Sequence, residues 1–331
     1  MKILVTGATG FVGNSLLKEL PRYFPEAEIS AFVLPDDPFK DMLSAHEKVR
    51  VVEGNIVNTG EVLEAVRGQT HVIHLVGLIS YWKKDYEKLM AVNKTGVENV
   101  VEACIAHGIA KLVHISSVGT MGFRKDGTCT IEEAHYNWPD RFYYMASKHE
   151  GQKIVEHAVK EQGLRAVILN PGAIMGPGDH NIHTAQNRLL NTIYKKVLFG
   201  CFSGGLAIVD VRDLVSIIIK VLHSEKIGEK YLVVGANVEY SQVVKTIAKY
   251  AEKRVYPFPV PSLLVSNVGS FLEKMSDLTK KRPLLTYAYG KLSGWKPYYS
   301  NEKSKKDFEH EYIPFEKTIE DTCRYFERKF L

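Results

Sequence analysis

Cysteine and long hydrophobic runs are both scarce in this chain of 331 residues. The four cysteines, Cys104, Cys129, Cys201 and Cys323, are far apart and show no Cys-x-x-Cys spacing, which excludes a paired disulfide framework and a cysteine-based metal site. The N-terminus reaches glycine at Gly7 without an apolar signal core. We therefore expect a reduced, cytoplasmic protein without a bound metal.

Membrane-spanning segments and dense basic stripes are absent as well. The apolar stretch from Leu263 to Leu272 is interrupted by Ser266, Asn267 and Ser270, so it is too short and too mixed to span a bilayer. We predict a helix that packs on the protein, with an interfacial membrane helix as the alternative. The 43 basic and 38 acidic residues leave a charge of +5, which suits a phosphate-bearing ligand. We expect neither a nucleic-acid partner nor a membrane partner.

The first half of the chain alternates short apolar runs with segments of helix length. The predicted strands are 2–5, 29–34, 49–52, 72–75, 112–115 and 166–169, and the predicted helices are 11–20, 60–67, 85–107 and 142–162. Continuous apolar strands separated by helices indicate a parallel sheet that is buried on both faces. The repeated βαβ order predicts an α/β fold of Rossmann type, with a doubly wound parallel sheet.

A glycine-rich turn follows the first predicted strand and precedes the first helix. Gly7 permits the tight turn, Gly10 lets the backbone approach a pyrophosphate, and Gly13 lets the helix pack closely on the strand. The N–H groups at the helix terminus then face the negative charge of the pyrophosphate. Glycines at this spacing between a strand and a helix predict a dinucleotide site.

The pattern loosens beyond about residue 170, where prolines separate shorter elements. We place an NAD(P)-binding Rossmann domain at residues 1–170 and a smaller C-terminal substrate-binding lobe at 171–331. Later strands are predicted at 207–209 and 231–234, and at least one of them is expected to rejoin the main sheet. The two parts are therefore interleaved in sequence.

The end of the second predicted strand should read the adenosine ribose, with an acid for NAD or a basic group for NADP. Leu34 occupies that position, and an apolar side chain there does not distinguish NAD from NADP. Asp36 can bond a ribose hydroxyl and Lys40 can meet a 2′-phosphate, but both also fit a solvated loop. These residues leave the choice between NAD and NADP open.

Tyr144 and Lys148 lie four residues apart in a predicted helix, so the phenol and the ammonium share one face. A nearby cation favours the phenolate, and we expect Lys148 to lower the pKa of Tyr144 toward working pH. Tyr144 can then donate a proton to a carbonyl oxygen as hydride arrives, or remove one in reverse. Ser117 ends a strand at the edge where α/β proteins bind ligands, and it can fix the substrate oxygen. A cap of the following turn is the alternative role for Ser117.

The sequence resembles the extended short-chain dehydrogenase/reductase family over nearly its whole length. The matching motifs are Thr6 to Gly13, Val72 to Gly77, Asn93 to Val97, Ser116-Ser117, Tyr144 to Lys148, Asn170 to Asp179 and Ile208 to Asp213. The resemblance implies that Gly7, Gly10, Phe11, Val12 and Gly13 form the pyrophosphate site, that Asn55 and Ile56 flank the adenine, and that Leu75, Val76 and Gly77 line the middle of the nucleotide. It further implies that Asn93, Tyr144 and Lys148 contact ribose, and that Pro171 to Ile174 pass over the nicotinamide.

The chain departs from the family pattern at three places. Asn55 stands where the family has Asp, Leu34 replaces the ribose discriminator, and Asn170-Pro171-Gly172 replaces the arginine-containing run of nucleotide-sugar epimerases and dehydratases. The Asn-Pro form and the run Val209 to Asp213 are similar to the dihydroflavonol-4-reductase-like branch, which reduces ketones or aldehydes with NADPH. The resemblance thus implies an NAD(P)-dependent oxidoreductase that acts on a small carbonyl or alcohol substrate, with NADP preferred over NAD.

Two other functions stay open. An NAD-dependent nucleotide-sugar epimerase or dehydratase needs a UDP-like pocket within 175–215, and its candidate basic residues, which also fit a solvated surface, are Arg188, Lys195, Lys196 and Arg212. A non-catalytic, cofactor-sensing binding protein would keep the fold without turnover. The presence of Ser117, Tyr144 and Lys148 together argues against that third function.

The histidines and the outer helices suggest further features. His180 and His183 lack a third ligand for a metal, so a loop or substrate-rim role is favoured. His74 and His114 lie beside or within apolar strands and are expected to be structural and hydrogen bonded. The resemblance also implies a homodimer in which the helices at 85–107 and 142–162 form a four-helix contact.

Overall fold

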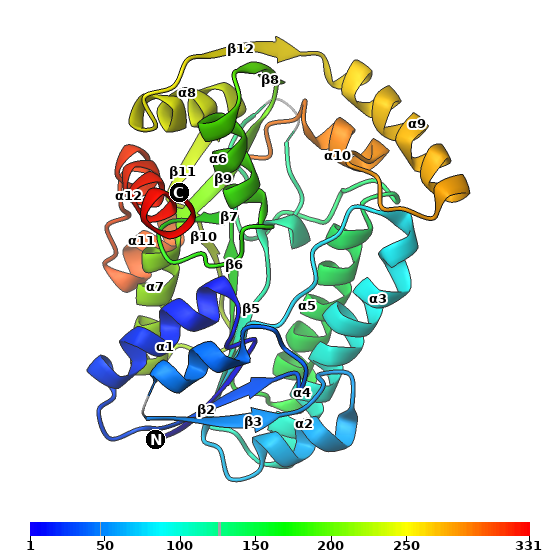
Figure 1. Ribbon diagram of the computed structural model, residues 1–331. Coiled ribbons are helices and arrows are strands. Elements are labelled where there is room, and N and C mark those ends of the chain that lie inside the picture. The colour runs from blue at the N-terminus through cyan, green and yellow to red at the C-terminus, as the bar shows by residue number, and fades with distance from the viewer. Residues whose placement is uncertain (47, 125–126) are drawn as a thin grey trace.

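The structure is a computed structural model that describes residues 1–46, 48–124 and 127–331 (Figure 1). Its main sheet contains β1 (Lys2–Thr6), β2 (Glu28–Val33), β3 (Val49–Glu53), β4 (His71–His74), β5 (Lys111–Ile115), β6 (Ala166–Pro171) and β10 (Lys230–Val233). The smaller sheets contain β7 (Ala173–Met175), β8 (Leu198–Phe202), β9 (Gly205–Asp210), β11 (Ala236–Glu239) and β12 (Val255–Val260). The α-helices are α1 (Phe11–Tyr23), α2 (Thr59–Val66), α3 (Tyr86–Met90), α4 (Gly96–Ala106), α5 (Tyr143–Gln162), α6 (Ala185–Lys195), α7 (Val211–His223), α8 (Tyr240–Tyr250), α9 (Ser262–Thr279), α10 (Tyr287–Leu292), α11 (Glu302–Phe308) and α12 (Phe315–Phe330).

The seven-stranded main sheet has the order β10-β6-β5-β4-β1-β2-β3, and every pairing in it is parallel. The strand order reverses beside β1, as it does in doubly wound sheets. This confirms the predicted Rossmann-type α/β fold. The later strand predicted at 231–234 rejoins the main sheet as β10, whereas the one at 207–209 lies in β9 of a separate three-stranded sheet.

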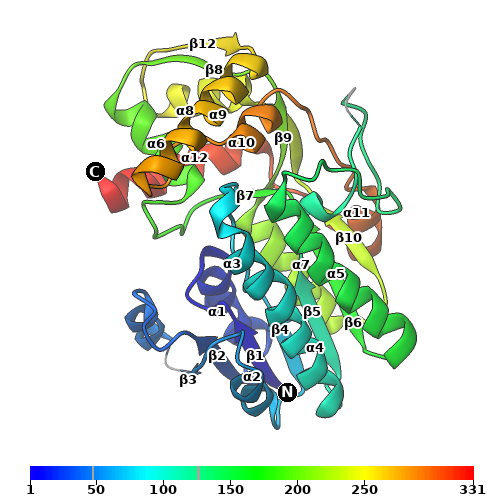
Figure 2. The same cartoon turned by 90° about the vertical axis from the view of Figure 1, so that its right-hand side faces the viewer.

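Alternate residues of each central strand supply the two halves of the core. Ile3 and Val5 of β1 pack in a cluster with α1 and α7, while Leu4 packs in the cluster formed with α2, α4 and α5. Both clusters consist of side chains that are almost fully buried, because successive strand residues point to opposite faces. Helices therefore cover the sheet on both sides (Figures 1 and 2).

The predicted helix at 85–107 is interrupted in the structure. A 3₁₀ turn (Lys83–Asp85) and α3 lead into a π-helical turn (Ala91–Thr95), after which α4 continues to Ala106. Apolar spacing does not distinguish a π turn from an α turn, because one inserted residue changes the phase only locally. The turn contains the buried Asn93, which is one of the predicted ribose residues.

The smaller lobe, which is predicted to bind substrate and is called the substrate lobe for that reason, lies above the carboxyl edge of the sheet in Figure 2 and is built mainly from β7, β8, β9, β11, β12, α6, α8, α9, α10 and α12. Its own core includes Leu190, Ile193, Ile247 and Phe326, so it is not merely a set of loops. The segment from α7 to β10 returns to the Rossmann sheet before the chain re-enters the lobe. Among the described residues, no helix combines the length and apolarity needed to cross a membrane.

Outward-facing positions on α4 and α5 are mainly charged. Glu98, Glu102 and Lys153 are exposed there, and Ile105 is the exposed apolar side chain of α4. The four-helix dimer contact stays a prediction, and it would have to be largely polar.

Replacing Ile73 with alanine should lower the free energy of unfolding by about 2–5 kcal/mol, because a fully buried central-strand side chain would be replaced by a cavity. Chemical denaturation followed by circular dichroism measures the change. The matched control is Ile79→Ala, which truncates a side chain that is 65% exposed and should change stability by less than about 0.5 kcal/mol. Equal losses in the two variants would contradict the burial argument.

Candidate active site

The glycine turn brings its backbone into direct contact with the first helix and with the end of β4. Gly7 has a φ of +70°, a conformation that residues with a side chain rarely adopt. A Cβ atom on Gly13 would lie 2.3 Å from the carbonyl oxygen of Gly7, so α1 packs on the turn without room for a side chain. A Cβ on Gly7 would come within 3.1 Å of the Val76 nitrogen. The predicted residues Leu75 and Val76 are thus placed beside the turn.

The N-terminus of α1 is open to an anion. Gly10 precedes the helix and offers no side-chain cap, so backbone N–H groups of the first turn have no capping side chain. The loop after β7 approaches from the other side, because a Cβ on Gly178 would lie 3.9 Å from the Phe11 ring. Phe11, Val12, Leu75 and Ile174 also pack against one shared apolar cluster. These features fit a bound pyrophosphate.

An acid that the sequence did not single out lies next to the glycine turn. Asp37 accepts hydrogen bonds from the Thr9 hydroxyl at 2.6 Å and from the Phe39 nitrogen at 2.8 Å. The sequence pointed to Asp36, which is the neighbouring residue. The sequence does not show which of the two side chains the loop turns toward the glycine turn. Lys40 is engaged elsewhere, in an ion pair with Glu53 at 2.7 Å.

Asn55 and Ile56, the predicted adenine residues, follow β3. Asn55 is exposed, and its side-chain oxygen accepts a hydrogen bond from the Val57 nitrogen at 3.2 Å. Ile56 is buried, and its carbonyl accepts from the Asn99 amide at 2.9 Å. The exposed amide of Asn55 can reach a base, while Ile56 can offer an apolar edge.

Asn93 connects three parts of the site. Its Oδ1 accepts from the Leu78 nitrogen at 2.8 Å, and its Nδ2 donates to the Leu78 carbonyl and to Ser147 Oγ, both at 2.9 Å. Gly77 lies directly beside this group, since a Cβ there would be 3.5 Å from both Asn93 Oδ1 and Lys148 Nζ. The loop after β4 and the helix α5 are therefore held together at the predicted ribose position.

Ser117, Tyr144 and Lys148 meet at the carboxyl edge of the sheet. Ser117 caps a 3₁₀ turn (Val118–Thr120) by accepting from the Gly119 nitrogen at 3.1 Å, and its side chain is close enough to Tyr144 to lower the pKa of that phenol in part. Tyr144 and Lys148 lie one turn apart on α5, and Lys148 Nζ donates to the Ile115 carbonyl at 3.0 Å. The capping role and the proposed substrate role of Ser117 are therefore compatible.

Burial dominates the electrostatics of this group. It raises the pKa of Tyr144, and the hydrogen bond from Ser117 lowers it in part. Burial also lowers the pKa of Lys148 to about 8. The expected lowering of the Tyr144 pKa by Lys148 is not seen, because the cost of desolvating the phenolate is the larger effect in this structure.

Two buried histidines lie behind Lys148. Their rings are stacked at 5.4 Å, and His74 shares a hydrogen bond with the Thr6 hydroxyl at 2.8 Å. Neither ring nitrogen of His114 has a partner within the described residues, so the expectation that it is hydrogen bonded was wrong. Burial, followed by the charge of Lys148, lowers the pKa of both, to about 3 for His74. Both rings are therefore neutral.

Asn170 has a positioning role that the sequence did not reveal. Its buried amide donates to the Ser117 carbonyl at 2.9 Å, to the Thr120 hydroxyl at 2.8 Å and to Gln152 Oε1 at 2.7 Å. Pro171 follows it at the end of β6 and is buried. The residue that departs from the epimerase pattern thus fixes the backbone of the Ser117 loop.

A chain of aromatic rings from four separate segments begins beside Tyr144. Tyr81 lies 6.0 Å from Tyr144 and 5.3 Å from Tyr289 of α10, measured between ring centroids. Phe202 of β8 contacts both Tyr289, at 5.6 Å, and Tyr240, at 5.3 Å. Burial raises the pKa of all three tyrosines other than Tyr144, so they are neutral phenols.

The basic residues considered for a UDP-like pocket are placed differently. Arg212 is paired with Asp210 at 2.7 Å and with Asp321 at 2.8 Å. Arg188, Lys195 and Lys196 are exposed at α6 and the residue that follows it. His180 packs edge-on against Phe39 at 4.6 Å, and the part of the chain that the structure describes holds no cluster of three or more His, Cys, Asp or Glu suited to a metal.

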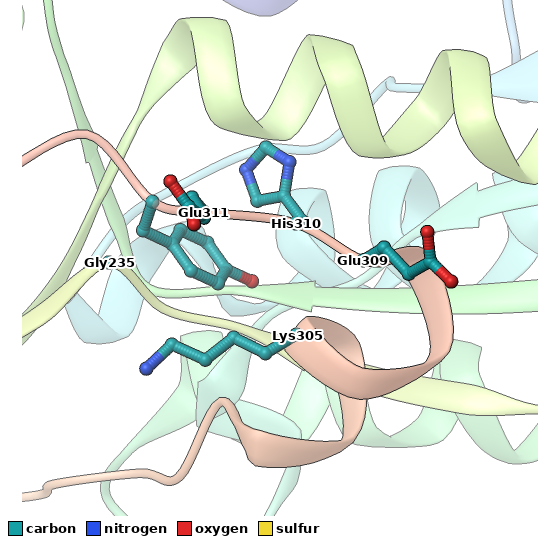
Figure 3. Close-up of a pocket in the computed structure, with 6 residues that line it drawn as sticks. Gly235, Lys305, Glu309, His310 and Glu311 are labelled. Carbon is teal, nitrogen blue, oxygen red and sulfur yellow. The ribbon is translucent and has the colours of Figure 1, made fainter.

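A hollow of about 630 Å³ lies outside this site, next to α11 (Figure 3). It is lined by Gly235, Lys305, Glu309, His310, Glu311 and Tyr312. In Figure 3 His310 points toward α7, where its ring pairs with Asp213 at 3.1 Å. None of these lining residues belongs to the catalytic or dinucleotide set.

The fold and the site together define a dinucleotide-binding protein of Rossmann type that carries a serine, tyrosine and lysine group. The family model described as "NAD dependent epimerase/dehydratase family" matches residues 3–235. The chain belongs to this family, within the extended short-chain dehydrogenase/reductases, whose members are NAD-dependent oxidoreductases, epimerases and dehydratases.

Several known proteins are similar to this chain in sequence. Cinnamoyl-CoA reductase 1 of Petunia hybrida is 23% identical over 99% of this chain and 92% of its own. Sterol demethylase protein B of Methylococcus capsulatus is 26% identical over 81% and 80%. UDP-glucose 4-epimerase of Vibrio cholerae is 24% identical over 89% and 90%. An uncharacterized protein of Frog virus 3 is 30% identical, but the match spans about half of each chain, 54% and 53%.

Solved structures show the same fold. The crystal structure of gox2253 has a TM-score of 0.84 at 23% identity, covering 99% of this chain and 98% of the other. UDP-glucuronic acid 4-epimerase from Bacillus cereus, in complex with UDP-glucuronic acid and NAD, has a TM-score of 0.79 at 18% identity and full coverage of both chains, 100% each. Reductases and epimerases are therefore both among the proteins similar to this chain.

Replacing Lys148 with methionine should raise the free energy of unfolding at neutral pH, by up to about 3 kcal/mol, because a buried charge with a pKa lowered from 10.5 to about 8 is removed. The pKa of Lys148 is about 8 in the folded protein and 10.5 in the unfolded chain, so between these two pH values the unfolded chain carries one more proton at this residue than the folded protein does. The stability difference between variant and native protein should therefore be constant below pH 8 and shrink as the pH rises.

Urea unfolding over this pH range measures that difference. Lys153→Met is the matched control, since Lys153 is an exposed lysine of the same helix and its removal relieves no buried charge. A Lys148→Met variant that is less stable at every pH would contradict the desolvation argument.

Proposed function

We propose that this protein is a reductase that transfers hydride from a nicotinamide cofactor to a ketone or aldehyde with an apolar or aromatic body. The observation that carries the proposal is the wall of rings beside Tyr144, formed by Tyr81, Phe202, Tyr240 and Tyr289. Neutral rings gain free energy by burying an apolar ligand, and they offer no charge to a diphosphate. The names of the reductase and sterol relatives agree with such a substrate.

The residues of the chain supply binding, orientation and proton transfer. When bound, the nicotinamide supplies or accepts the hydride. In this proposal Ser117 Oγ and the Tyr144 hydroxyl hold the substrate oxygen, and Tyr144 gives it a proton as the alcohol forms. Lys148, anchored on the Ile115 carbonyl, would hold the nicotinamide ribose and place positive charge near the phenol. Asn170 keeps the Ser117 loop in place.

The preferred cofactor follows from the loop after β2. The family resemblance implies NADP. However, Leu34 is exposed and Lys40 is paired with Glu53. Neither of these two described residues therefore offers a free cation to a 2′-phosphate. Asp37 instead places a carboxylate against Thr9 of the glycine turn. A carboxylate there accepts hydrogen bonds from ribose hydroxyls and repels a 2′-phosphate. We therefore propose NAD as the preferred cofactor.

A nucleotide-sugar epimerase is the second candidate. It is favoured by the carboxylate at Asp37, because an epimerase of this family uses NAD, and by the epimerase among the relatives. The pairing of Arg212 with two carboxylates disfavours it, since a diphosphate would have to displace both. Tightly retained NAD together with binding of UDP would support the epimerase over the reductase.

Replacing Tyr144 with phenylalanine should lower the rate of carbonyl reduction by about a hundredfold or more, because the proton donor is lost. The assay is nicotinamide absorbance over a panel of aryl, alicyclic and short polar ketones and aldehydes, and the apolar and aromatic members should react fastest. Cofactor affinity should change little. The neighbouring Tyr143→Phe is the control, since its ring packs on Tyr86 instead of on the site.

Near-full turnover by Tyr144→Phe would contradict the role of that residue. A panel in which no carbonyl reacts would favour the cofactor-sensing binding protein.

Binding of NADH should be at least about tenfold tighter than binding of NADPH. The 2′-phosphate of NADPH would repel the Asp37 carboxylate, whereas the ribose hydroxyl of NADH would donate a charge-assisted hydrogen bond to it. Titration of the pure protein, followed by nicotinamide fluorescence, measures both affinities after any co-purified nucleotide is identified. Asp37→Ala should lose most of this discrimination. Asp36→Ala should keep it, because Asp36 makes no contact with the glycine turn among the hydrogen bonds of the described residues. Tighter binding of NADPH by the native protein would overturn the assignment.

A further inference from the structure

The helix α9 exposes a continuous apolar stripe. Leu264, Val268, Phe271, Met275 and Leu278 follow one another at alternating spacings of four and three residues, so they lie on one side of the helix. Their exposed fractions are 58%, 53%, 62%, 40% and 77%. The stripe is about 21 Å long at the usual helical rise. We call it the α9 stripe.

The opposite side of α9 explains why this stripe stays uncovered. A Cβ on Gly269 would lie 2.4 Å from the Thr286 carbonyl, and one on Gly290 of α10 would lie 2.5 Å from Ser266 Cα. The two helices therefore meet backbone to backbone through small residues. Figure 1 shows α9 at the outer edge of the substrate lobe, with α10 on its inner side. The helix packs on the protein as expected, with Val265 buried and Leu272 half-buried, but the large apolar side chains of the α9 stripe do not take part.

Charge around the α9 stripe has one sign. Lys274 is three residues from Phe271 and four from Leu278, so it flanks the stripe, and the exposed Lys280 and Lys281 follow the end of the helix. Within the described chain none of these three lysines forms an ion pair.

Both acids of α9 are used elsewhere. Glu273 accepts a hydrogen bond from the Tyr287 nitrogen at 3.3 Å, and Asp277 is paired with Lys83 at 2.7 Å and with Lys84 at 3.2 Å. These pairs connect the end of α9 to the loop after β4. The side of the helix that carries the stripe therefore presents apolar and positive groups without a negative one.

Further apolar groups extend the exposed set beyond the stripe. Leu263 is 61% exposed and Leu284, just after the basic segment, is 98% exposed. The strand β12 leads directly into α9, and its Tyr256 and Phe258 are 51% and 57% exposed. Apolar exposure of this extent on a folded protein marks an interaction surface.

We propose that the α9 stripe docks on the surface of an anionic lipid bilayer, with Lys274, Lys280 and Lys281 at the level of the headgroups. An amphipathic helix lying in the interface buries its apolar side among acyl chains while flanking lysines attract anionic lipid. A second copy of the chain would cover the stripe equally well, but it would place lysines near lysines without acids to pair with. The charge pattern thus selects a negative surface over self-association.

This docking is independent of the proposed chemistry, although it has a consequence for it. Because α10 carries Tyr289 of the ring wall and packs directly on α9, a docked helix would hold the substrate lobe against the bilayer. An apolar substrate could then enter from the lipid phase.

Cosedimentation with vesicles of equimolar phosphatidylcholine and phosphatidylserine tests the proposal. The native protein should bind these vesicles, bind pure phosphatidylcholine more weakly, and lose affinity as salt is raised. Leu264→Glu with Phe271→Glu should reduce binding at least about tenfold, since two apolar anchors become charges of the wrong sign. Tyr23→Glu with Leu63→Glu adds the same charge at exposed apolar positions on α1 and α2, and it should bind like the native protein.

Two further measurements separate the outcomes. Lys274→Ala with Lys281→Ala leaves the stripe intact and should reduce binding to the anionic vesicles by roughly tenfold or more. Sedimentation velocity reports the oligomeric state of each variant, and thermal unfolding confirms that each is folded. A folded native protein that fails to bind the anionic vesicles would overturn the proposal, as would undiminished binding by the stripe variant. A native dimer that becomes a monomer only in the stripe variant, without vesicle binding, would assign the surface to a second copy.

Discussion

The carboxamide of Asn93 is the contact on which the geometry of the site depends. It holds the backbone of Leu78 on one side and Ser147 of α5 on the other, and Lys148 is the next residue of that helix. A Cβ atom on Gly151 of α5 would lie 2.1 Å from the backbone carbonyl oxygen of Asn93. The helix α5 therefore packs directly on the π-helical turn. The turn, the glycine and the amide together place the lysine between the end of β5 and the loop after β4. A change in any one of them would move the ammonium away from the nucleotide's expected position.

Desolvation is the second constraint on the site. Tyr144, Lys148, His74 and His114 are all removed from water, and burial shifts each of their pKa values toward the neutral form. The two histidines remain uncharged beside the lysine, which avoids further repulsion in a medium of low dielectric constant. The ring wall continues this dry environment toward the substrate lobe. The site is therefore suited to a proton transfer that water would otherwise compete for.

Much of the fold follows from local sequence. Runs such as Lys2 to Val5 and Leu112 to Ile115 are continuous and apolar because both faces of the sheet are covered, and this pattern alone predicted six of the seven main strands in order, with β10 as the later one that rejoins the sheet. The glycine turn could be predicted equally well, because the residues that determine its backbone conformation all lie within one short segment. The π turn at Ala91–Thr95 was not, since its hydrogen bonds depend on what packs against it.

The roles that the sequence did not reveal share one property, which is that the interacting residues lie far apart in sequence. Asp37 is paired with Thr9, 28 residues earlier, and Asn170 holds Ser117, 53 residues earlier. The ring wall combines residues from the loop after β4, β8, α8 and α10. No periodicity within a segment encodes such pairs, because loop conformation and helix packing decide them.

The sequence by itself determined the class of fold, the dinucleotide turn and the one-turn spacing of Tyr144 and Lys148, since each of these depends on residues that are close in the chain. Only the tertiary structure decided which acid reaches the glycine turn, which ring packs on Tyr144 and which side of α9 remains exposed. The exposed side of α9 shows how helix packing decides which side chains of a segment are buried. The run from Leu263 to Leu272 is predicted to be a packing helix, and it is one, but Gly269 and Ser266 make the contact with α10 and leave Leu263 and Leu264 exposed.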